Sequence, residues 1–196
     1  MIDSLFDKDY WESRYAVQKT GWDVGYISTP LKKYFDQLGN KDLRILIPGA
    51  GNGHEAIYLF ESGFSNVHVL DISPLAIAHF QANCPHFPFT QVHLQDFWEH
   101  YGEYDLIVEQ TFFCAIVPKL RTDYCSKVAE LLVPRGKIVG LLWGVPMNEQ
   151  HPPFGGDAAE YQKLFESTFE ISTMEAAYNS IAPRSGRELF INMIKK

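Results

Sequence analysis

Short apolar runs alternate with segments of helical spacing along most of the chain. The apolar runs predict strands at residues 43–48, 67–71, 89–94, 104–110, 137–143, 169–175 and 187–194. The intervening segments predict helices at residues 53–62, 74–83, 119–132 and 158–167. Strands separated by helices of about ten to fifteen residues are typical of parallel sheets, and continuous apolar runs suit strands covered on both faces. We therefore expect an α/β fold with a mostly parallel, doubly wound sheet of about seven strands.

The first part of the chain precedes this alternation. Residues 3–18 contain neither glycine nor proline and predict a helix, and residues 19–28 form a turn-rich loop. A second helix is expected to begin at Pro30, because proline suits the first turn of a helix. Trp11 and Trp22 fall in this otherwise polar region, where the simplest interpretation is that they cap one end of a core.

Composition and charge narrow the class of protein. The chain has 196 residues and a net charge of −7, so its acidic surface makes nucleic acid a poor partner. No apolar run approaches the ~20 residues that span a membrane, and the opening residues are too acidic for a signal peptide. The three cysteines are far apart, and neither they nor the histidines show metal-ligand spacing. We expect a cytoplasmic, monomeric protein with reduced thiols and with no metal, membrane or nucleic-acid partner.

The stretch L-R-I-L-I-P-G-A-G-N-G, residues 43–53, carries the strongest chemical signal. A predicted strand runs into a tight turn with alternating glycines, namely Gly49, Gly51 and Gly53. Glycine is needed where a side chain would collide with a ligand or where φ is positive. A dinucleotide fingerprint would need a further glycine at His54 or at Ala56. The alternation instead resembles the glycine loop of S-adenosylmethionine (SAM) methyltransferases; the alternative is a tight turn that binds no ligand.

Polar side chains follow the next two predicted strands. Asp71 ends the second strand, where a carboxylate can accept hydrogen bonds from both hydroxyls of a ribose. The alternative is that Asp71 caps the next helix, but Ser73 is better placed for that role. Beyond the third strand, Asp96 can accept a hydrogen bond from the adenine amine and Phe97 can pack on the base, unless this is an ordinary loop. Together with the glycine turn after the first strand, these residues at the ends of the next two strands indicate an adenosine site.

The fourth predicted strand ends in the block E-Q-T-F-F-C-A-I, residues 109–116. Glu109 and Gln110 are expected to meet the methionine end of a SAM cofactor. Phe112 and Phe113 either wall an apolar pocket or belong to the core. Methyltransferases that act on amino groups of DNA often carry N-P-P-Y or D-P-P-Y at this place, and this chain does not.

Several motifs of the chain occur together in one known family. I-P-G-A-G-N-G-H-E is similar to that family's V-P-G-C-G-G-G-H-D, and Y-D-L-I-V-E-Q-T-F-F-C-A-I to its F-D-L-I-F-D-Y-x-F-F-C-A-I. Trp11, Tyr15 and Trp22 have the spacing of its W-x3-W-x6-W, and V-L-D-I-S, P-P-F and A-P-R-S-G-R also have counterparts. Over nearly its whole length the chain thus resembles the thiopurine S-methyltransferase family, and within it the halide and thiol (thiocyanate) methyltransferases.

This resemblance implies a Rossmann-like class I methyltransferase fold with SAM as cofactor and S-adenosylhomocysteine as product. It implies a single domain over residues 1–196, with a helical lid at 1–40 and a core at 41–196. The implied cofactor residues are Trp11, Tyr15, Trp22, Gly49, Gly51, Gly53, Asp71, Ile72, Asp96, Phe97 and Gln110.

Within that set the resemblance implies separate roles. Gly49 would contact the methionine part of SAM, and Ile72 would lie against adenine beside the two residues after the third strand. Trp11 and Trp22 would close the lid over the cofactor. Two positions depart from the family, since Tyr15 stands where tryptophan is usual and Gln110 where plant relatives carry tyrosine.

The resemblance also implies a small acceptor, namely a thiol, bisulfide, thiocyanate or halide. Such acceptors are anionic or nearly so, and a general base is therefore optional; positioning and removal of water suffice. The candidates to wall the acceptor pocket are Phe112, Phe113, Trp143 and Phe154. The cationic side chains that either attract the anion or form surface ion pairs are Arg14, Arg184 and Arg187.

Three other functions stay open at this point. A few pocket side chains decide the acceptor, so a SAM methyltransferase of a carboxylate, phenol or metalloid is an alternative. A nicotinamide-dependent oxidoreductase would use a similar sheet, but the glycine spacing disfavours it. A non-catalytic SAM-binding module is a third alternative, because Tyr15 and Gln110 depart from the family pattern.

Overall fold

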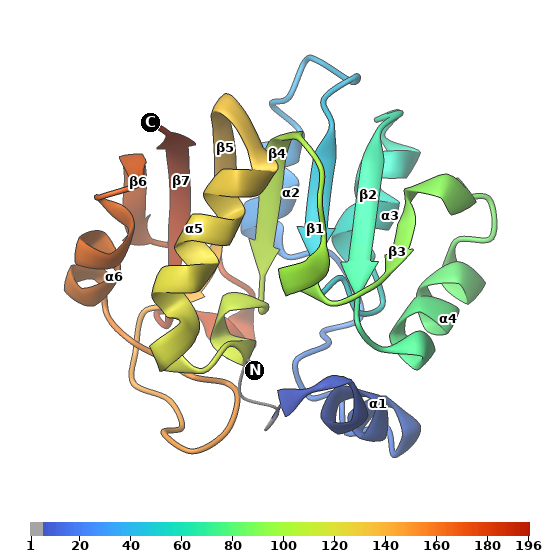
Figure 1. Cartoon of the computed structure of the whole chain (residues 1–196), viewed down its shortest axis with the longest axis horizontal. Coiled ribbons are helices and arrows are strands. Elements are labelled where there is room, and N and C mark those ends of the chain that lie inside the picture. Colours follow the sequence, from blue (N-terminus) through green and yellow to red (C-terminus); the bar gives the residue numbers. More distant parts are fainter. Residues whose placement is uncertain (1–5) are drawn as a thin grey trace.

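The computed structural model describes residues 6–196, which form one central seven-stranded sheet in the order β3-β2-β1-β4-β5-β7-β6 (Figure 1). The strands are β1 (Ile45–Pro48), β2 (Val67–Asp71), β3 (Val92–Leu94), β4 (Tyr104–Gln110), β5 (Leu132–Trp143), β6 (Phe169–Ala176) and β7 (Glu188–Lys195). β3, β2, β1, β4 and β5 run parallel, and β7 pairs antiparallel with both β5 and β6. The predicted α/β fold with a mostly parallel sheet is confirmed.

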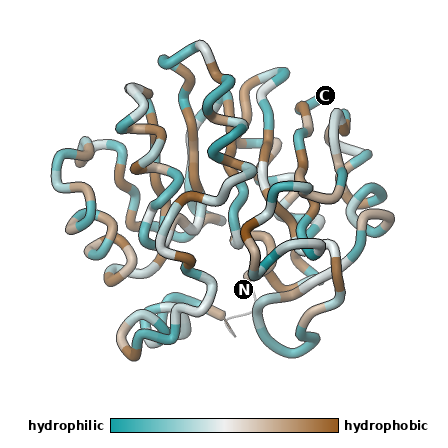
Figure 2. The backbone as a smooth tube through the Cα atoms, turned by 180° about the vertical axis from the view of Figure 1, so that it is seen from behind, coloured by the Kyte–Doolittle hydropathy of each residue, from teal (hydrophilic) through white to brown (hydrophobic). Residues whose placement is uncertain are grey.

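Helices cover both faces of this sheet. The covering helices are α2 (Thr29–Phe35), α3 (His54–Glu61), α4 (Pro74–Asn83), α5 (Arg121–Leu131) and α6 (Ala158–Phe165), while α1 (Lys8–Ala16) lies apart from the sheet (Figure 1). Tyr124 of α5 and Phe165 of α6 belong to the core cluster on one face. Phe35, Leu59 and Phe80, from α2, α3 and α4, belong to the cluster on the other face. Figure 2 shows hydrophobic and hydrophilic positions alternating along these outer helices, as expected for helices with one buried side.

Some boundaries differ from the prediction. α1 begins after Asp7, whose carboxylate accepts a hydrogen bond from the Tyr10 N–H at 3.1 Å; the start of the predicted 3–18 helix lies outside the described residues. The predicted turn at 134–136 lies inside β5, because Arg135 adopts a φ of 64° and the pairing with β4 shifts its register there. The other elements differ from the prediction by a few residues at most. Over the described residues, no helix has the length and apolar character to cross a membrane.

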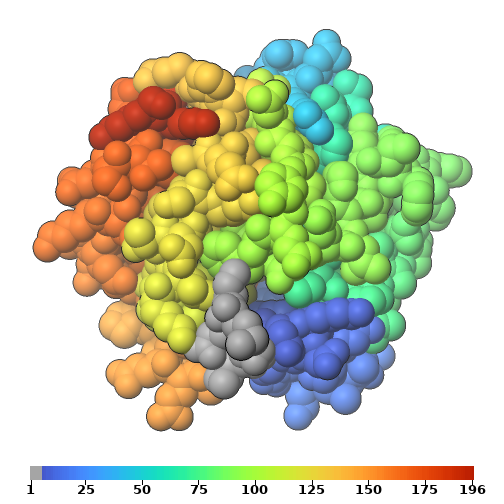
Figure 3. Space-filling view, in the orientation of Figure 1, coloured from blue at the N-terminus to red at the C-terminus, as the bar shows by residue number. Residues whose placement is uncertain are grey.

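The carboxyl ends of the parallel strands determine where a ligand can bind. β1 lies between β2 and β4, so the chain connections run in opposite directions along the sheet from this point. In such sheets, ligands bind in the crevice at this topological switch. α1 lies beyond these strand ends and apart from the sheet (Figure 1), and Figure 3 shows it in dark blue against the green part of the surface. The fold therefore places α1 over the switch point.

Candidate active site

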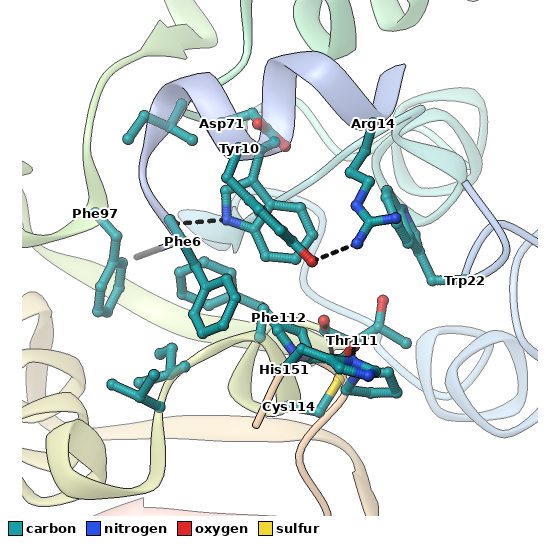
Figure 4. Close-up of a pocket in the computed structure, with 18 of the residues that line it drawn as sticks. Phe6, Tyr10, Arg14, Trp22, Asp71, Phe97, Thr111, Phe112, Cys114 and His151 are labelled. Carbon is teal, nitrogen blue, oxygen red and sulfur yellow. Dashed lines mark hydrogen bonds between the residues drawn. The ribbon is translucent and has the colours of Figure 1, made fainter. Parts of the chain in front are cut away.

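One large cavity lies between α1 and the carboxyl ends of the strands. Its volume is about 730 Å³, within the ~300–1,000 Å³ typical of cofactor and ligand pockets. The lining comes from α1, the turns after β1 and β2, the loops after β3 and β4, the 144–157 loop and the late segment 182–187. Figure 4 shows side chains from these distant segments gathered around one space.

The structure brings most of the predicted cofactor residues to this cavity. Those that line it are Trp11, Tyr15, Trp22, Gly49, Asp71, Ile72, Asp96 and Phe97. Gly51 and Gln110 line a smaller cavity of about 50 Å³, which shares Thr111 with the large one. Gly53 lines neither cavity, because it starts α3 with a φ of 73° and lies against the Phe80 ring. The role of Gly53 is thus to shape the turn.

The glycine turn and Asp71 form one hydrogen-bonded unit. The Asp71 carboxylate accepts the N–H of Gly51 through Oδ2 and the N–H of Ser73 through Oδ1, each at 2.9 Å. Burial raises the pKa of Asp71, while these backbone N–H groups act in the opposite direction. Each carboxylate oxygen keeps a lone pair for a further donor. Ser73 caps α4 as predicted, since its hydroxyl accepts the N–H of Ala76 at 3.2 Å.

Aromatic rings of α1 and the following loop form one wall of the cavity. Trp11 and Trp22 meet edge to face with ring centroids 5.6 Å apart, and Tyr15 meets Trp22 in the same way at 5.8 Å. The Trp11 indole N–H donates to the Phe6 carbonyl at 3.0 Å (Figure 4). A Cβ at Gly51 would lie 2.8 Å from the Tyr15 hydroxyl, so glycine is required for this close approach of α1. The predicted lid aromatics therefore lie together, directly over the glycine turn.

Glu12 ties α1 to α4, a contact that the sequence pattern did not indicate. Its Oε2 accepts the Ser73 hydroxyl at 2.6 Å and the Leu75 N–H at 3.2 Å. A carboxylate at the N-terminus of a helix also interacts favourably with the helix dipole. Glu12 thereby fixes α1 beside the end of β2, next to Asp71.

The loop after β4 departs most from the prediction. Glu109 is fully buried and faces away from the cavity, since its carboxylate accepts hydrogen bonds from the N–H groups of Phe112 and Phe113. Phe112 lines the cavity, but Phe113 packs in the core against α5 and α6. Phe154 is also buried outside the lining, and its N–H donates to the Cys114 carbonyl at 2.7 Å. Phe113 and Phe154, which were predicted to wall the cavity, instead pack behind its wall.

Arg184 is buried in the cavity wall. It donates to the Trp22 carbonyl at 2.7 Å and pairs with the buried Glu188 carboxylate at 3.3 Å. A buried arginine of this kind is held by its partners and fixes the loop of Trp22 against β7. The expected surface ion pair is in fact a buried one.

Two further arginines of the lining have no carboxylate partner among the described residues. Arg14 donates to the Tyr10 hydroxyl at 2.9 Å, and its guanidinium lies 4.9 Å from the centre of that ring (Figure 4). Arg187 lies 4.8 Å from the centre of the Trp143 ring, and both residues line the cavity. Both guanidinium groups are thus available to an anion in the cavity.

Three lining residues were not singled out from the sequence. Thr111 has a φ of 57°, which is unusual for a β-branched residue and reverses the chain directly after β4. Burial raises the pKa of the Cys114 thiol to about 12, so this thiol stays protonated at neutral pH. His151, from the 144–157 loop, lines the same cavity as Cys114 and Thr111 and is labelled in Figure 4. Thr111 and Cys114 lie in the E-Q-T-F-F-C-A-I block, but no sequence signal pointed to these two side chains or to His151.

Solved structures of methyltransferases share this fold. A Burkholderia thailandensis 1,6-didemethyltoxoflavin-N1-methyltransferase with bound S-adenosylhomocysteine aligns with a TM-score of 0.75 over 96% of this chain and 86% of its own, at 18% identity. A magnesium protoporphyrin IX methyltransferase from Synechocystis with bound SAM aligns with a TM-score of 0.71 over 96% and 95%, at 16% identity. The chain therefore has the fold of class I SAM-dependent methyltransferases.

Sequence comparison then gives the family. The chain matches the thiopurine S-methyltransferase family over residues 6–193 and belongs to it. A probable thiol methyltransferase 2 of Arabidopsis thaliana is 30% identical over 91% of this chain and 81% of its own, as is the thiocyanate methyltransferase 1 of that plant. A thiopurine S-methyltransferase of Vibrio campbellii is 26% identical over 82% of both chains. The protein is a SAM-dependent methyltransferase of small molecules, as the sequence predicted.

Proposed function

We propose that this methyltransferase acts on a small thiol, bisulfide, thiocyanate or halide. The observation that carries the proposal is the chemistry of the cavity wall beyond the glycine turn. Phe112, Trp143 and Arg187 lie there, while Glu109, the nearest carboxylate in sequence, is turned into the core. Aromatic rings strip water from a soft anion, and guanidinium groups attract it. The names of the plant thiol and thiocyanate relatives support this acceptor class.

The residues present fit SAM. We assign the ribose to Asp71, whose two oxygens keep lone pairs for the hydroxyls beside their backbone partners. We assign the other parts by position: adenine to Ile72, Asp96 and Phe97, the methionine part to Gly49, Gly51 and Gln110, and the lid to Trp11, Tyr15 and Trp22. When bound, SAM supplies an electrophilic methyl group on a sulfonium cation.

The residues of the chain orient the acceptor anion, attract it and remove its water. The α1 lid excludes water from the cavity, and Arg14 and Arg187 raise the local concentration of an anion. Phe112 and Trp143 would hold that anion beside the cofactor, and near-attack positioning of two reactants can contribute about 7–11 kcal/mol. An anionic acceptor already has a free lone pair with which to attack the methyl group, so its methylation needs no base.

A thiol that arrives protonated needs a base, and we assign that role to His151. Its Nδ1 lies 2.9 Å from the Pro152 carbonyl oxygen, a contact that requires the proton on Nδ1. Nε2 then keeps a lone pair that would accept the thiol proton, while the methyl group would pass from the cofactor sulfur to the acceptor sulfur and S-adenosylhomocysteine would leave. Cys114 is unsuited to this step because its own thiol stays protonated.

The test is turnover with acceptors of different proton content. Purified protein and SAM are incubated with iodide, thiocyanate, bisulfide and an aromatic thiol, and the methylated products are measured. Product from none of them, despite SAM binding, would contradict the acceptor class. His151→Gln should lower turnover of a protonated thiol by about 100-fold and leave iodide turnover unchanged. Equal losses for both acceptors would contradict the base role.

We further infer that the protein is a monomer of the cytoplasm with a single domain over 1–196, its lid at 1–40 and no nucleic-acid partner. The free, buried state of Cys84, Cys114 and Cys125 supports a reducing compartment. The net charge of −7 supports the absence of a nucleic-acid partner. Sedimentation at two protein concentrations tests the monomer.

A further inference from the structure

The Glu109 carboxylate lies at the end of β4, behind the wall of the cavity. The side chain is fully buried. Gly140 of β5 pairs with Glu109 across the two strands, and a Cβ at Gly140 would overlap the Glu109 backbone and Cβ. The glycine in the otherwise bulky β5 run therefore leaves the room that Glu109 needs.

Three donors converge on this carboxylate. Oε1 accepts the N–H groups of Phe112 and Phe113, both at 2.8 Å, and Oε2 accepts the Tyr124 hydroxyl of α5 at 2.7 Å. Among the described residues no cation pairs with Glu109, so the hydrogen bonds alone offset the loss of water around its charge. The two N–H groups belong to the loop between β4 and α5. Glu109 therefore links that loop to the core.

This loop sets the position of the Phe112 ring. Thr111 turns the chain with a φ of 57°, and the Phe112 ring then lies 5.0 Å from the Phe97 ring, centre to centre. A Cβ at Gly49 would overlap the same ring, so Phe112 fills the space that this glycine leaves. The orientation of the wall thus depends on the two N–H groups that Glu109 holds.

We propose that Glu109 is a positioning residue for methyl transfer: through the Phe112 and Phe113 N–H groups, and supported by Tyr124, its ionised carboxylate fixes the wall of the acceptor pocket. This inference rests on the proposed function, because it assigns Phe112 to the acceptor. Glu109 does not touch a reactant and acts only through the loop.

The same geometry makes the pocket sensitive to pH. Burial raises the pKa of Glu109 to about 7, against the effect of its three donors. The titratable groups that face it are Tyr124 of α5 and Cys114 of the loop, and burial keeps both protonated at neutral pH. As the pH falls through about 7, Glu109 gains a proton and its charge-assisted hydrogen bonds weaken by about half. The loop then holds Phe112 less firmly.

The test uses iodide as acceptor, because iodide carries no proton in this range. In the native protein, kcat/KM for iodide should fall on the order of tenfold below pH 7, mainly through KM. Glu109→Gln keeps the size but has no charge, so it should show the low value at every pH. Its Kd for SAM should stay within about twofold of the native value. Hydrogen exchange at residues 111–117, measured without SAM, should be faster in this variant.

Tyr124→Phe gives a second, independent readout. It removes one donor from the carboxylate, so the midpoint of the iodide profile should move to higher pH. Tyr161→Phe is the matched control: Tyr161 lies in the same core cluster but donates to the Trp143 carbonyl, so the midpoint should stay. If Glu109→Gln fails to fold, the Tyr124→Phe shift alone decides.

Several outcomes overturn the proposal. They are a native pH decline that persists in Glu109→Gln, an unmoved midpoint in Tyr124→Phe, and a loss of SAM affinity equal to the loss for iodide. Failure of the proposed function looks different, because the native protein would then bind SAM and methylate no iodide at any pH.

Discussion

The Asp71 carboxylate both holds the local backbone and faces the cavity. It holds the glycine turn through Gly51, it holds the start of α4 through Ser73, and it faces the cavity. Those backbone partners use only part of its accepting capacity. A ligand with two hydroxyl groups therefore meets a carboxylate that is already fixed in place, which lowers the entropic cost of binding.

Asp71→Asn should weaken SAM binding by about 10- to 100-fold, because hydrogen bonds to a charged group contribute roughly 1.5–3 kcal/mol. Titration calorimetry gives the affinity, and circular dichroism confirms the fold. Asp105→Asn is the matched control, since Asp105 accepts the Arg44 N–H at 2.8 Å at the far end of the sheet. SAM affinity should stay unchanged there. A native affinity in Asp71→Asn would show that the ribose lies elsewhere.

Adjacent residues illustrate what the sequence predicted at this scale. Phe112 and Phe113 have the same chemistry, and the pattern offered both as pocket walls. Only Phe112 lines the cavity. Thr111, directly before the two rings, has a positive φ and ends the alternation of side chains along β4. No periodicity encodes that reversal, so the choice between the two rings required coordinates. The position of Asp71 was predictable, because it ends the regular strand β2 and no chain reversal precedes it.

At the scale of elements, α1 is the part whose placement matters most for function. The aromatic spacing predicted which side chains of α1 meet the cavity, but nothing predicted its anchor. Glu12 and Ser73 are 61 residues apart in the chain, and their hydrogen bond depends on the tertiary fold. The local sequence pattern therefore predicts which side of α1 faces the cavity, but not the contact that anchors the helix.

Glu12→Gln should loosen the attachment of α1 to α4. The amide bonds the Ser73 hydroxyl and the Leu75 N–H less strongly than the carboxylate does, so SAM should dissociate roughly tenfold faster. Stopped-flow fluorescence of Trp11 and Trp22 measures the rate. Asp9→Asn serves as control, because Asp9 is an exposed carboxylate of the same helix. Equal dissociation rates in Glu12→Gln and the native protein would show that α1 closes without this anchor.

A second element-scale feature is a histidine cluster at the β3 edge of the sheet. His68 of β2 and His93 of β3 approach at 2.9 Å between Nδ1 and Nε2, and His100 bonds the Tyr104 hydroxyl at 2.8 Å. Burial, the neighbouring histidines and the Arg44 charge lower the pKa of His68 and of His100 to about 4. The neutral forms of these histidines are therefore part of the folded state.

This cluster should make the protein acid-labile. Between about pH 6.5 and 4 the unfolded chain binds more protons at these histidines than the folded one does, so stability is present above pH 6.5 and falls as the pH drops. Each ~1 kcal/mol lost lowers Tm by about 2–4 °C in a chain of this size. Calorimetry at stepped pH follows the decline. His100→Gln should reduce its slope, and the exposed His86→Gln should not; identical slopes would remove the cluster from the explanation.

For the whole molecule, topology was the most predictable property. Apolar strands alternate with helices that have one apolar side. This pattern predicts a parallel sheet with a ligand site at the carboxyl ends of its strands. The antiparallel pairing of β7 between β5 and β6 was not predicted, since the last two apolar runs contain no signal of partner or direction. The cavity could be located in advance, and Arg184 and Arg187 of the late segment were candidates for its cations, but the burial of Arg184 with Glu188 required coordinates.

Because the cavity is lined from α1 to the late segment 182–187, one ligand touches parts that are distant along the chain. S-adenosylhomocysteine at 100 times its Kd should stabilise the fold by about 2.7 kcal/mol and raise Tm by about 5–10 °C. NAD at the same concentration should give no shift, because His54 and Ala56 stand where a dinucleotide turn needs glycine. Asp71→Asn should lower the shift at fixed ligand concentration, which ties the effect to this cavity. An equal shift with NAD would mean that the glycine turn does not discriminate between the two cofactors, and the assignment of the methionine part to it would fail.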